Sequence, residues 1–428
     1  MPDARFTGNL RFISVMKTIT YLAALAALLV SCASCRGIIN DIDAKSNPYK
    51  PLELSTKSGE LVQKGESFTF SFIDNINAGA KQDYIVSPLS MQFLLGMILD
   101  GARGDTAAEI AKVLGYGAGE TDAVNEYCLS MLKQLPELDK KTTLTIANAI
   151  FVDDGWPLLD SYTSMVEKYY KAEVANLDFK DEAKSLKAIN GWCDKQTRGM
   201  VPKILDKVDP EMLAYLLNAM YFKSQWKEKF PKASTSKEDF TYEDASRGKV
   251  EMMKVNKSYR YNDNDIFQIV NLPYGNGAFS MVVLLPKPKR TVAEITKYLR
   301  KADWGALRGD MVTCDVDLWL PKFETKYHIK LNDLLSEMGM PSAFDSEKAD
   351  FKAMSKFALC LSFVQQDAII KVDEEGTEAA VVSIGGMMKE TAVAPGEHVV
   401  FHADHPFIYL ITEASTGAVL FAGRYGSK

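Results

Sequence analysis

The segment 279–285 places the strongest constraint on how this chain can fold. It reads FSMVVLL and carries no charged side chain. A continuous apolar run of this kind is typical of a β-strand that is covered on both faces. A second strand is indicated by Val316, Leu318 and Leu320, which alternate with Asp315, Asp317 and Trp319 in the two-residue period of a sheet. The second half of the chain is therefore expected to be rich in long strands.

The two halves of the sequence differ in their apolar periodicity. Residues 407–411 and 418–422 flank the sequence TEASTG, which predicts a hairpin with Gly417 in the turn. Apolar residues recur at helical spacing in two stretches of the first half: Phe68, Phe72, Ile73 and Ile76, and Leu94, Leu95, Ile98 and Leu99. Ser87-Pro88 predicts the start of the second of these helices. Helices early and strands late indicate an α+β fold with antiparallel sheets.

Composition excludes several classes of function. The chain has 428 residues, which at roughly 150 residues per domain favours two or three domains. However, residues 61–428 contain no Pro/Gly/Ser linker and no repeat, which favours one continuous unit. The net charge of −6 disfavours binding to nucleic acid. Three of the four histidines fall within eight residues, and we expect no metal site and no cofactor.

Common catalytic motifs are incomplete or out of order. The sequence contains no GxSxG, no HExxH and no P-loop. An SxxK begins at Ser130, a YxN at Tyr274 and a KSG at Lys57, but the KSG element comes first here, whereas it comes last in penicillin-binding enzymes. We therefore expect that the protein is not an enzyme.

The N-terminus has the features of an export signal. Residues 21–30 form an unbroken apolar run that is too short to span a bilayer, and Lys17 lies just before it. The sequence Leu29-Val30-Ser31-Cys32 resembles a bacterial lipobox, which implies lipidation of Cys32; the alternative is a plain secretory signal. We predict a signal peptide at 1–31, with the true start at Met16, and a polar tether at 32–60. This implies a cell-envelope protein anchored in the outer membrane, facing the periplasm or the exterior, and beyond the inner membrane in either case.

Residues 372–396 form an unusual segment near the C-terminus. It is longer than the ~12–15 residues beyond which a loop is usually functional. From Thr377 onward, alternate residues are uncharged and small or β-branched, while Glu378 falls on the other face. Such a segment is able to enter a sheet as a strand. The alternative is an ordinary edge strand followed by a flexible exit.

Many ordered motifs in residues 61–428 are similar to those of one known family. They are Val86-Ser87-Pro88-Leu89-Ser90, Gly101-Ala102-Arg103-Gly104-Asp105-Thr106, Ile146-Ala147-Asn148-Ala149, Ala172-Glu173-Val174, Leu217-Asn218-Ala219, Tyr221-Phe222-Lys223, Trp226-Lys227, Val372 to Ala380, Ala403-Asp404-His405-Pro406-Phe407 and Leu420-Phe421-Ala422-Gly423-Arg424. On these motifs the chain resembles the serpins, a family of serine protease inhibitors. The resemblance implies a serpin domain at 61–428 with three β-sheets, about nine helices and an exposed reactive-centre loop at about 374–396.

The resemblance also implies a mechanism and its residues. A target protease cleaves the loop and forms an acyl-enzyme, and the loop then inserts as a new strand of the central sheet. The hinge of this loop corresponds to Glu374, Glu375, Gly376, Thr377, Glu378, Ala379 and Ala380. A polar cluster under the sheet, the shutter, corresponds to Ser87, Ser90, Asn218 and Gln366. Gln366 replaces the family's usual histidine, and because an amide both donates and accepts hydrogen bonds we expect the network to persist without that histidine's pH dependence.

The scissile bond is expected between Lys389 and Glu390. The family places it about fifteen residues beyond the hinge glycine, which falls at Lys389 or Glu390. The neighbours are Met387, Met388 and Thr391. Counting back from Pro406 instead reaches Pro395, so the loop carries extra residues on its C-terminal side and the register stays open. Lysine suits the acidic pocket of trypsin-like enzymes, whereas the methionines suit elastase- or chymotrypsin-like enzymes.

Two functions follow from the resemblance. The first is inhibition of serine proteases, with cysteine proteases as a broader class of target. The inhibitor would be a monomer that is anchored to a membrane by its lipid. The alternative is a non-inhibitory serpin that acts as a binding or carrier protein. That alternative predicts a charged or proline-containing hinge. The hinge strand in this chain has neither feature on its core-facing side.

Overall fold

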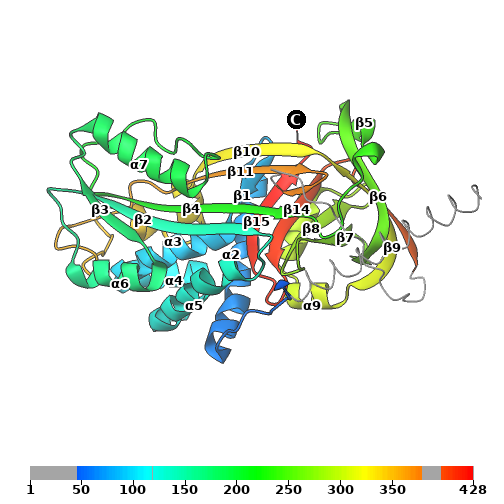
Figure 1. Ribbon diagram of the computed structural model, residues 1–428. Coiled ribbons are helices and arrows are strands. Elements are labelled where there is room, and N and C mark those ends of the chain that lie inside the picture. Colours follow the sequence, from blue (N-terminus) through cyan, green and yellow to red (C-terminus); the bar gives the residue numbers. More distant parts are fainter. Residues whose placement is uncertain (1–45, 118, 378–396, 428) are drawn as a thin grey trace, which may run out of the picture. The chain divides into compact units, whose positions relative to one another are not determined.

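A computed structural model describes residues 46–117, 119–377 and 397–427 (Figure 1). These residues contain nine α-helices: α2 (Thr56–Gly79), α3 (Pro88–Gly101), α4 (Gly104–Leu114), α5 (Thr121–Gln134), α6 (Asp160–Tyr170), α7 (Glu182–Gln196), α8 (Val292–Leu299), α9 (Trp304–Gly309) and α10 (Asn332–Met338). Both predicted helices are present, as α2 and α3. The Ser87 side chain accepts a hydrogen bond from Ser90 N at the start of α3, with Pro88 in the first turn.

A six-stranded sheet forms the centre of the fold. Its strands, in spatial order, are β10 (Phe323–Lys330), β11 (Gln365–Asp373), β12 (Gly376–Thr377), β4 (Ala214–Gln225), β2 (Thr143–Asp153) and β3 (Glu173–Leu177). Figure 1 shows α7 on one side of this sheet and α3 on the other. Successive residues of β2 belong to different apolar cores, because Ile150 packs on the α3 side and Phe151 packs with Trp192 of α7. The central sheet is therefore covered on both faces.

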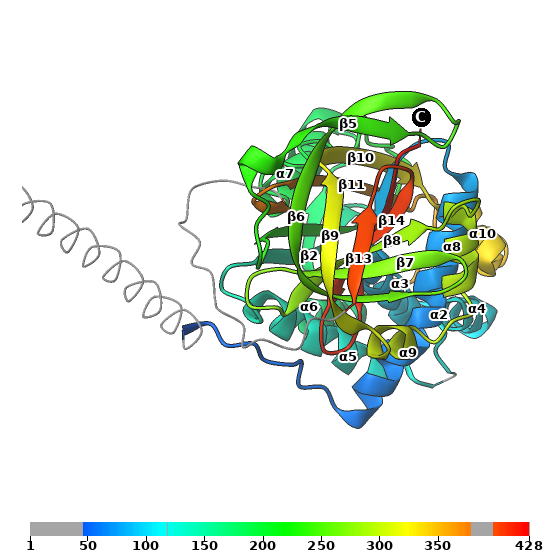
Figure 2. The same cartoon turned by 90° about the vertical axis from the view of Figure 1, so that its right-hand side faces the viewer.

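A second, nine-stranded network contains two groups of strands. The first group is β1 (Tyr84–Val86), β15 (Val419–Tyr425), β14 (Phe407–Glu413), β8 (Phe279–Pro286) and β7 (Phe267–Pro273). The second group is β5 (Ser236–Thr241), β6 (Arg247–Asp263), β9 (Val312–Pro321) and β13 (His398–His402), and the end of β6 joins the groups by pairing with β7. Figure 2 shows these strands beside the central sheet. With the central sheet they give three strand groups, so the α+β prediction with three sheets is confirmed.

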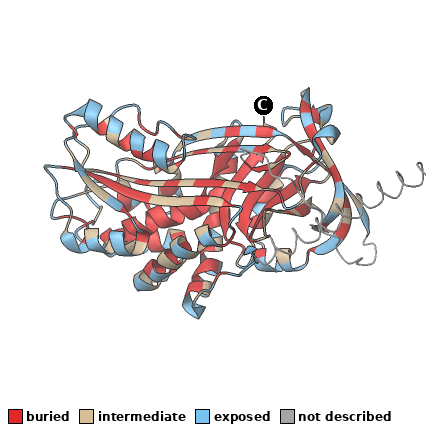
Figure 3. Ribbon diagram, in the orientation of Figure 1, coloured by how far each residue is buried: buried red, intermediate tan, exposed pale blue. Residues whose placement is uncertain are grey.

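Burial follows the predictions for the strands. Every residue of β8, which contains the apolar run 279–285, is buried (Figure 3). β14 and β15 form the predicted antiparallel hairpin, with Gly417 at a positive φ in its turn. All the elements named here belong to one compact unit that begins at Tyr49. No helix in the described part of the chain is long and apolar enough to cross a membrane.

The folded unit begins earlier than the sequence predicts. The sequence places the end of the tether at residue 60, whereas α2 begins at Thr56 and Leu52 is already buried. Leu52 N donates to Ser415 Oγ at 3.0 Å, and the backbone of Glu53 exchanges two hydrogen bonds with the Gln134 side chain. The polar composition of this stretch conceals its docking, because only Leu52 and Leu54 pack against the apolar core and the other contacts named here are hydrogen bonds to residues far away in sequence. The predicted signal peptide and Cys32 lie outside the described residues.

Candidate functional site

Among the described residues, only the two-residue strand β12 lies between β4 and β11 of the central sheet, and we call the rest of this place the unfilled strand position. The two-residue strand β12 lies between them and is antiparallel to both, pairing Thr377 with Val372 on one side and with Ser224 on the other. Over residues 214–223 and 365–371, the facing edges of β4 and β11 pair with no strand of the described chain. A narrow pocket lined by both strands lies directly beyond Thr377. An antiparallel strand continuing from β12 would therefore meet hydrogen-bonding edges on both sides.

Gly376 is required by the close packing of β12 on β4. An added Cβ at this position would collide with the carbonyl oxygen of Ser224 and approach Gln225 Cα to 2.7 Å. The Asp373 side chain accepts hydrogen bonds from the backbone N–H groups of Glu375 and Gly376, at 2.9 and 3.3 Å. The chain thus makes a short, internally bonded turn from β11 into β12.

Thr377 faces the core. Its side chain is only 2% exposed, and its Oγ1 lies 2.5 Å from the hydroxyl of Tyr274. The Tyr274 ring stacks on Trp226, with the ring centroids 4.5 Å apart. Trp226 in turn holds the turn before β12, because its Nε1 donates to Asp373 O at 2.8 Å and its backbone N donates to Glu375 O at 2.9 Å. The beginning of β12 is therefore fixed by a buried aromatic layer.

Three ion pairs with lysines hold the hinge carboxylates, one to Glu374 and two to Glu375. Glu374 accepts from Lys322 Nζ at 2.9 Å and from Thr235 Oγ1 at 3.0 Å. Burial by itself would raise the pKa of Glu374, but the hydrogen bonds from Lys322, Thr235 and the backbone, together with the charge of Lys322, outweigh burial and the pKa is lowered. The more exposed Glu375 pairs with Lys229 at 2.6 Å, which lowers its pKa. Both carboxyl groups are therefore ionised in the folded state at neutral pH.

Ser87, Ser90, Asn218 and Gln366 meet in one hydrogen-bond network. Gln366 holds the backbone of Ser87 at two points: its Oε1 accepts from Ser87 N at 2.8 Å and its Nε2 donates to Ser87 O at 3.0 Å. Ser90 Oγ donates to Asn218 Oδ1. Gln366 belongs to β11 and Asn218 to β4, so the start of α3 binds both strands that flank the unfilled position. The Gln366 amide therefore makes two hydrogen bonds at the position where the family usually has a histidine, as expected for a group that both donates and accepts.

Sequence reasoning missed several residues of this site. Asn148 extends the network, accepting from Asn218 Nδ2 and donating to the backbone of Tyr170, both at 2.7 Å. It lies within a quoted motif, but its role was not singled out. In the sequence Tyr274 belongs only to a chance YxN motif, and Lys322 carries no local signal, because its partner is 52 residues away in sequence.

Other predicted site residues lie outside the described part of the chain. They are Glu378, Ala379 and Ala380 of the hinge, Lys389 and Glu390 at the expected scissile bond, and Met387, Met388 and Thr391 beside it.

Comparison with known proteins agrees with this architecture. The family model described as Serpin (serine protease inhibitor) matches residues 63–427. Serpin B6 of Macaca fascicularis is 33% identical over 377 residues, which cover 86% of this chain and 99% of the relative. The leukocyte elastase inhibitor of Xenopus tropicalis is 32% identical and covers 84% of this chain and 97% of its own. The crystal structure of the thermophilic serpin tengpin in the native state is similar with a TM-score of 0.78 and 30% identity, covering 89% of this chain and 97% of tengpin. The fold and the strand position in its sheet define a serpin architecture. The chain belongs to the serpin family.

Proposed function

We propose that this serpin inhibits serine proteases by covalent trapping, in which the cleaved loop inserts between β4 and β11. The single observation that supports this most directly is the unfilled strand position, which continues β12 between two hydrogen-bonding edges. A strand inserted there satisfies backbone groups along both neighbours, which supplies the driving force. Trypsin-like proteases are the favoured targets because of Lys389, and elastase- or chymotrypsin-like and cysteine proteases are further candidates.

The test is to mix the full-length protein with trypsin and to separate the products on a denaturing gel. We expect a band that resists denaturation and has the combined mass of the protein and the protease. Lys389→Ala should remove most of this band, because the acidic pocket of trypsin loses its cation. Its matched control is Glu390→Ala, which leaves the lysine in place. Clean cleavage of the wild-type loop without a covalent band would instead support the non-inhibitory alternative of a binding or carrier protein.

We further propose that the mature protein is a monomer anchored to a membrane of the cell envelope through a lipid on Cys32. The support is the sequence Leu29-Val30-Ser31-Cys32 after a short apolar run. Cys32→Ala should release the protein from the membrane fraction or leave the precursor uncleaved, whereas Cys35→Ala should change neither. Equal recovery of the Cys32→Ala and wild-type proteins with membranes would refute the anchor.

A further inference from the structure

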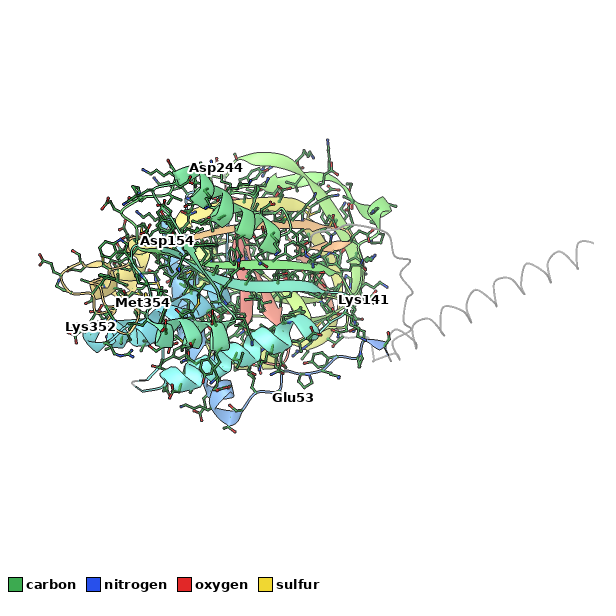
Figure 4. All side chains as sticks on the ribbon, turned by 60° about the vertical axis from the view of Figure 1, so that its left-hand side comes forward. Glu53, Lys141, Asp154, Asp244, Lys352 and Met354 are labelled. Atoms are coloured by element: carbon green, nitrogen blue, oxygen red, sulfur yellow. The ribbon has the colours of Figure 1, made fainter. Side chains whose placement is uncertain are left out.

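An exposed aromatic pair lies at the end of the central sheet where β2 finishes. Trp156 and Phe357 are 42% and 39% exposed, and their ring centroids are 4.7 Å apart in an edge-to-face arrangement. Asp154, Met354 and Lys352, close to the pair in sequence, lie at one end of the sheet in Figure 4, whereas Lys141, just before β2, lies at the other. Two large exposed aromatic rings in contact are typical of a binding surface.

The turn that carries Trp156 is held rigidly. Asp153 is buried, and its carboxylate accepts from the backbone N–H groups of Gly155 at 2.9 Å and Phe179 at 3.1 Å. Asp153 N also donates to Leu213 O at 2.9 Å, which ties this turn to the residue just before β4. The turn that carries Trp156 is therefore bound to the chain just before β4.

The segment carrying Phe357 is bound to the same turn. Leu158 and Ser355 form an isolated antiparallel bridge, and Leu159 N donates to Met354 O at 2.9 Å. β11 begins eight residues after Phe357. The pair thus lies where the strand position between β4 and β11 ends.

The register of β12 identifies what arrives there after insertion. Thr377 pairs with Val372 of β11 and with Ser224 of β4. Because both pairings are antiparallel, the residue twelve positions after Thr377 would pair with the residues twelve positions before Val372 and before Ser224. These are Lys389 on the inserted segment, Cys360 before β11 and Met212 before β4. Met212 precedes Leu213, which is bonded to the Trp156 turn, and Cys360 is three residues from Phe357. A protease acylated through Lys389 would be delivered to the aromatic pair.

We propose that Trp156 and Phe357 form the docking surface for the arrested serine protease. This inference rests on the proposed function. The ester between the Lys389 carbonyl and the protease serine holds the partner close, so the effective concentration is high and a modest apolar contact suffices. Release requires water to add to that carbonyl, which frees the Lys389 carboxylate and regenerates the serine hydroxyl. Contact with the aromatic pair holds the protease at this end of the sheet and slows its release.

The test compares the full-length protein with the double variant Trp156→Ser, Phe357→Ser, using trypsin as the probe. First contact with trypsin occurs at the loop, so the rate of complex formation should not change. Active trypsin should be released from the isolated complex about tenfold faster than from the wild-type complex. The control Tyr49→Ser removes an aromatic side chain of similar exposure, 45%, and should release trypsin at the wild-type rate.

The outcomes separate this inference from the function on which it rests. If the double variant releases trypsin within about twofold of the wild-type rate, the docking surface is refuted. It is also refuted if trapping falls while release from the remaining complex is unchanged, because the pair would then act during insertion. The absence of any complex with the wild-type protein would overturn the proposed function, and this inference with it. Trp156→Phe, Phe357→Leu keeps an apolar surface and should restore slow release, which separates docking from a folding defect.

Discussion

At the scale of single residues, the burial of Thr377 gives the most direct test of insertion. Its side chain lies in an apolar layer and contacts the Tyr274 hydroxyl. Thr377→Arg would place a charge there, at a cost of about a few kcal/mol unless it finds a partner. Insertion should then be slower than hydrolysis of the acyl-enzyme, and the variant should be cleaved as a substrate. The ratio of covalent complex to cleaved protein at a fixed amount of trypsin measures this.

Two controls accompany this variant. Thr377→Ser keeps the hydroxyl and should trap trypsin as the wild type does. Glu378→Arg changes the next residue, whose side chain points to the opposite face of an inserted strand and stays in water. If Thr377→Arg and Glu378→Arg trap trypsin equally well, the insertion hypothesis is wrong.

Asp100 gives a prediction about the pH dependence of stability. Burial raises the pKa of Asp100 to about 6, and hydrogen bonds from Asn125 and Tyr170 offset this only in part. An unfolded aspartate titrates near about pH 4, so the folded state holds this proton more tightly. The stability from this group is therefore complete below about pH 4 and is lost as the pH rises through about 6.

Asp100→Asn removes this pH dependence because an amide does not titrate. The Tm of the variant minus that of the wild type should be more positive at about pH 7.5 than at about pH 4.5. Thermal unfolding at the two pH values measures this difference. The control is Asp105→Asn, in the exposed first turn of α4. For this variant, the difference in Tm from the wild type should be the same at both pH values. Equal differences for Asp100→Asn would show that burial does not perturb this carboxyl group.

At the scale of secondary-structure elements, Gln366 fastens β11 to the start of α3. Gln366→Ala would leave the buried N–H and C=O of Ser87 without this partner, which costs about 1–3 kcal/mol. We expect a lower denaturant midpoint for the uncleaved protein. Lys371→Ala, an exposed change on the same strand, should be neutral within about 0.5 kcal/mol. An unchanged midpoint for Gln366→Ala would mean that water replaces the amide fully.

The elements differ in how far the sequence alone predicts them. The strand 279–285 and the helix after Ser87 were predicted because continuous apolar burial and an N-cap are local signals. The docking of Leu52 was not, because it depends on hydrogen bonds to residues far away in sequence. The same holds for the site: the family motifs identify Ser87 and Gln366, whereas no local pattern reveals the contact between Thr377 and Tyr274.

At the scale of the whole molecule, the unfilled strand position has an energetic consequence. In the uncleaved protein, the backbone N–H and C=O groups along two facing strand edges pair with no strand of the described chain. The edges lie at residues 214–223 of β4 and 365–371 of β11. An intact loop opposes complete filling of this position. The chain enters the position at Gly376, and while it is uncleaved it must also connect to β13. Cleavage removes this constraint. The native state is therefore expected to be less stable than the cleaved state.

This difference predicts a large gain in thermal stability on cleavage. Each ladder hydrogen bond contributes about 0.5–1.5 kcal/mol, so a strand paired on both sides should raise the Tm by about 10 °C or more. The measurement is thermal unfolding of the protein before and after cleavage with a protease that cuts the loop without being trapped. An unchanged Tm for the cleaved wild-type protein would show that the position between β4 and β11 stays unfilled, and it would rule out insertion as the source of inhibition.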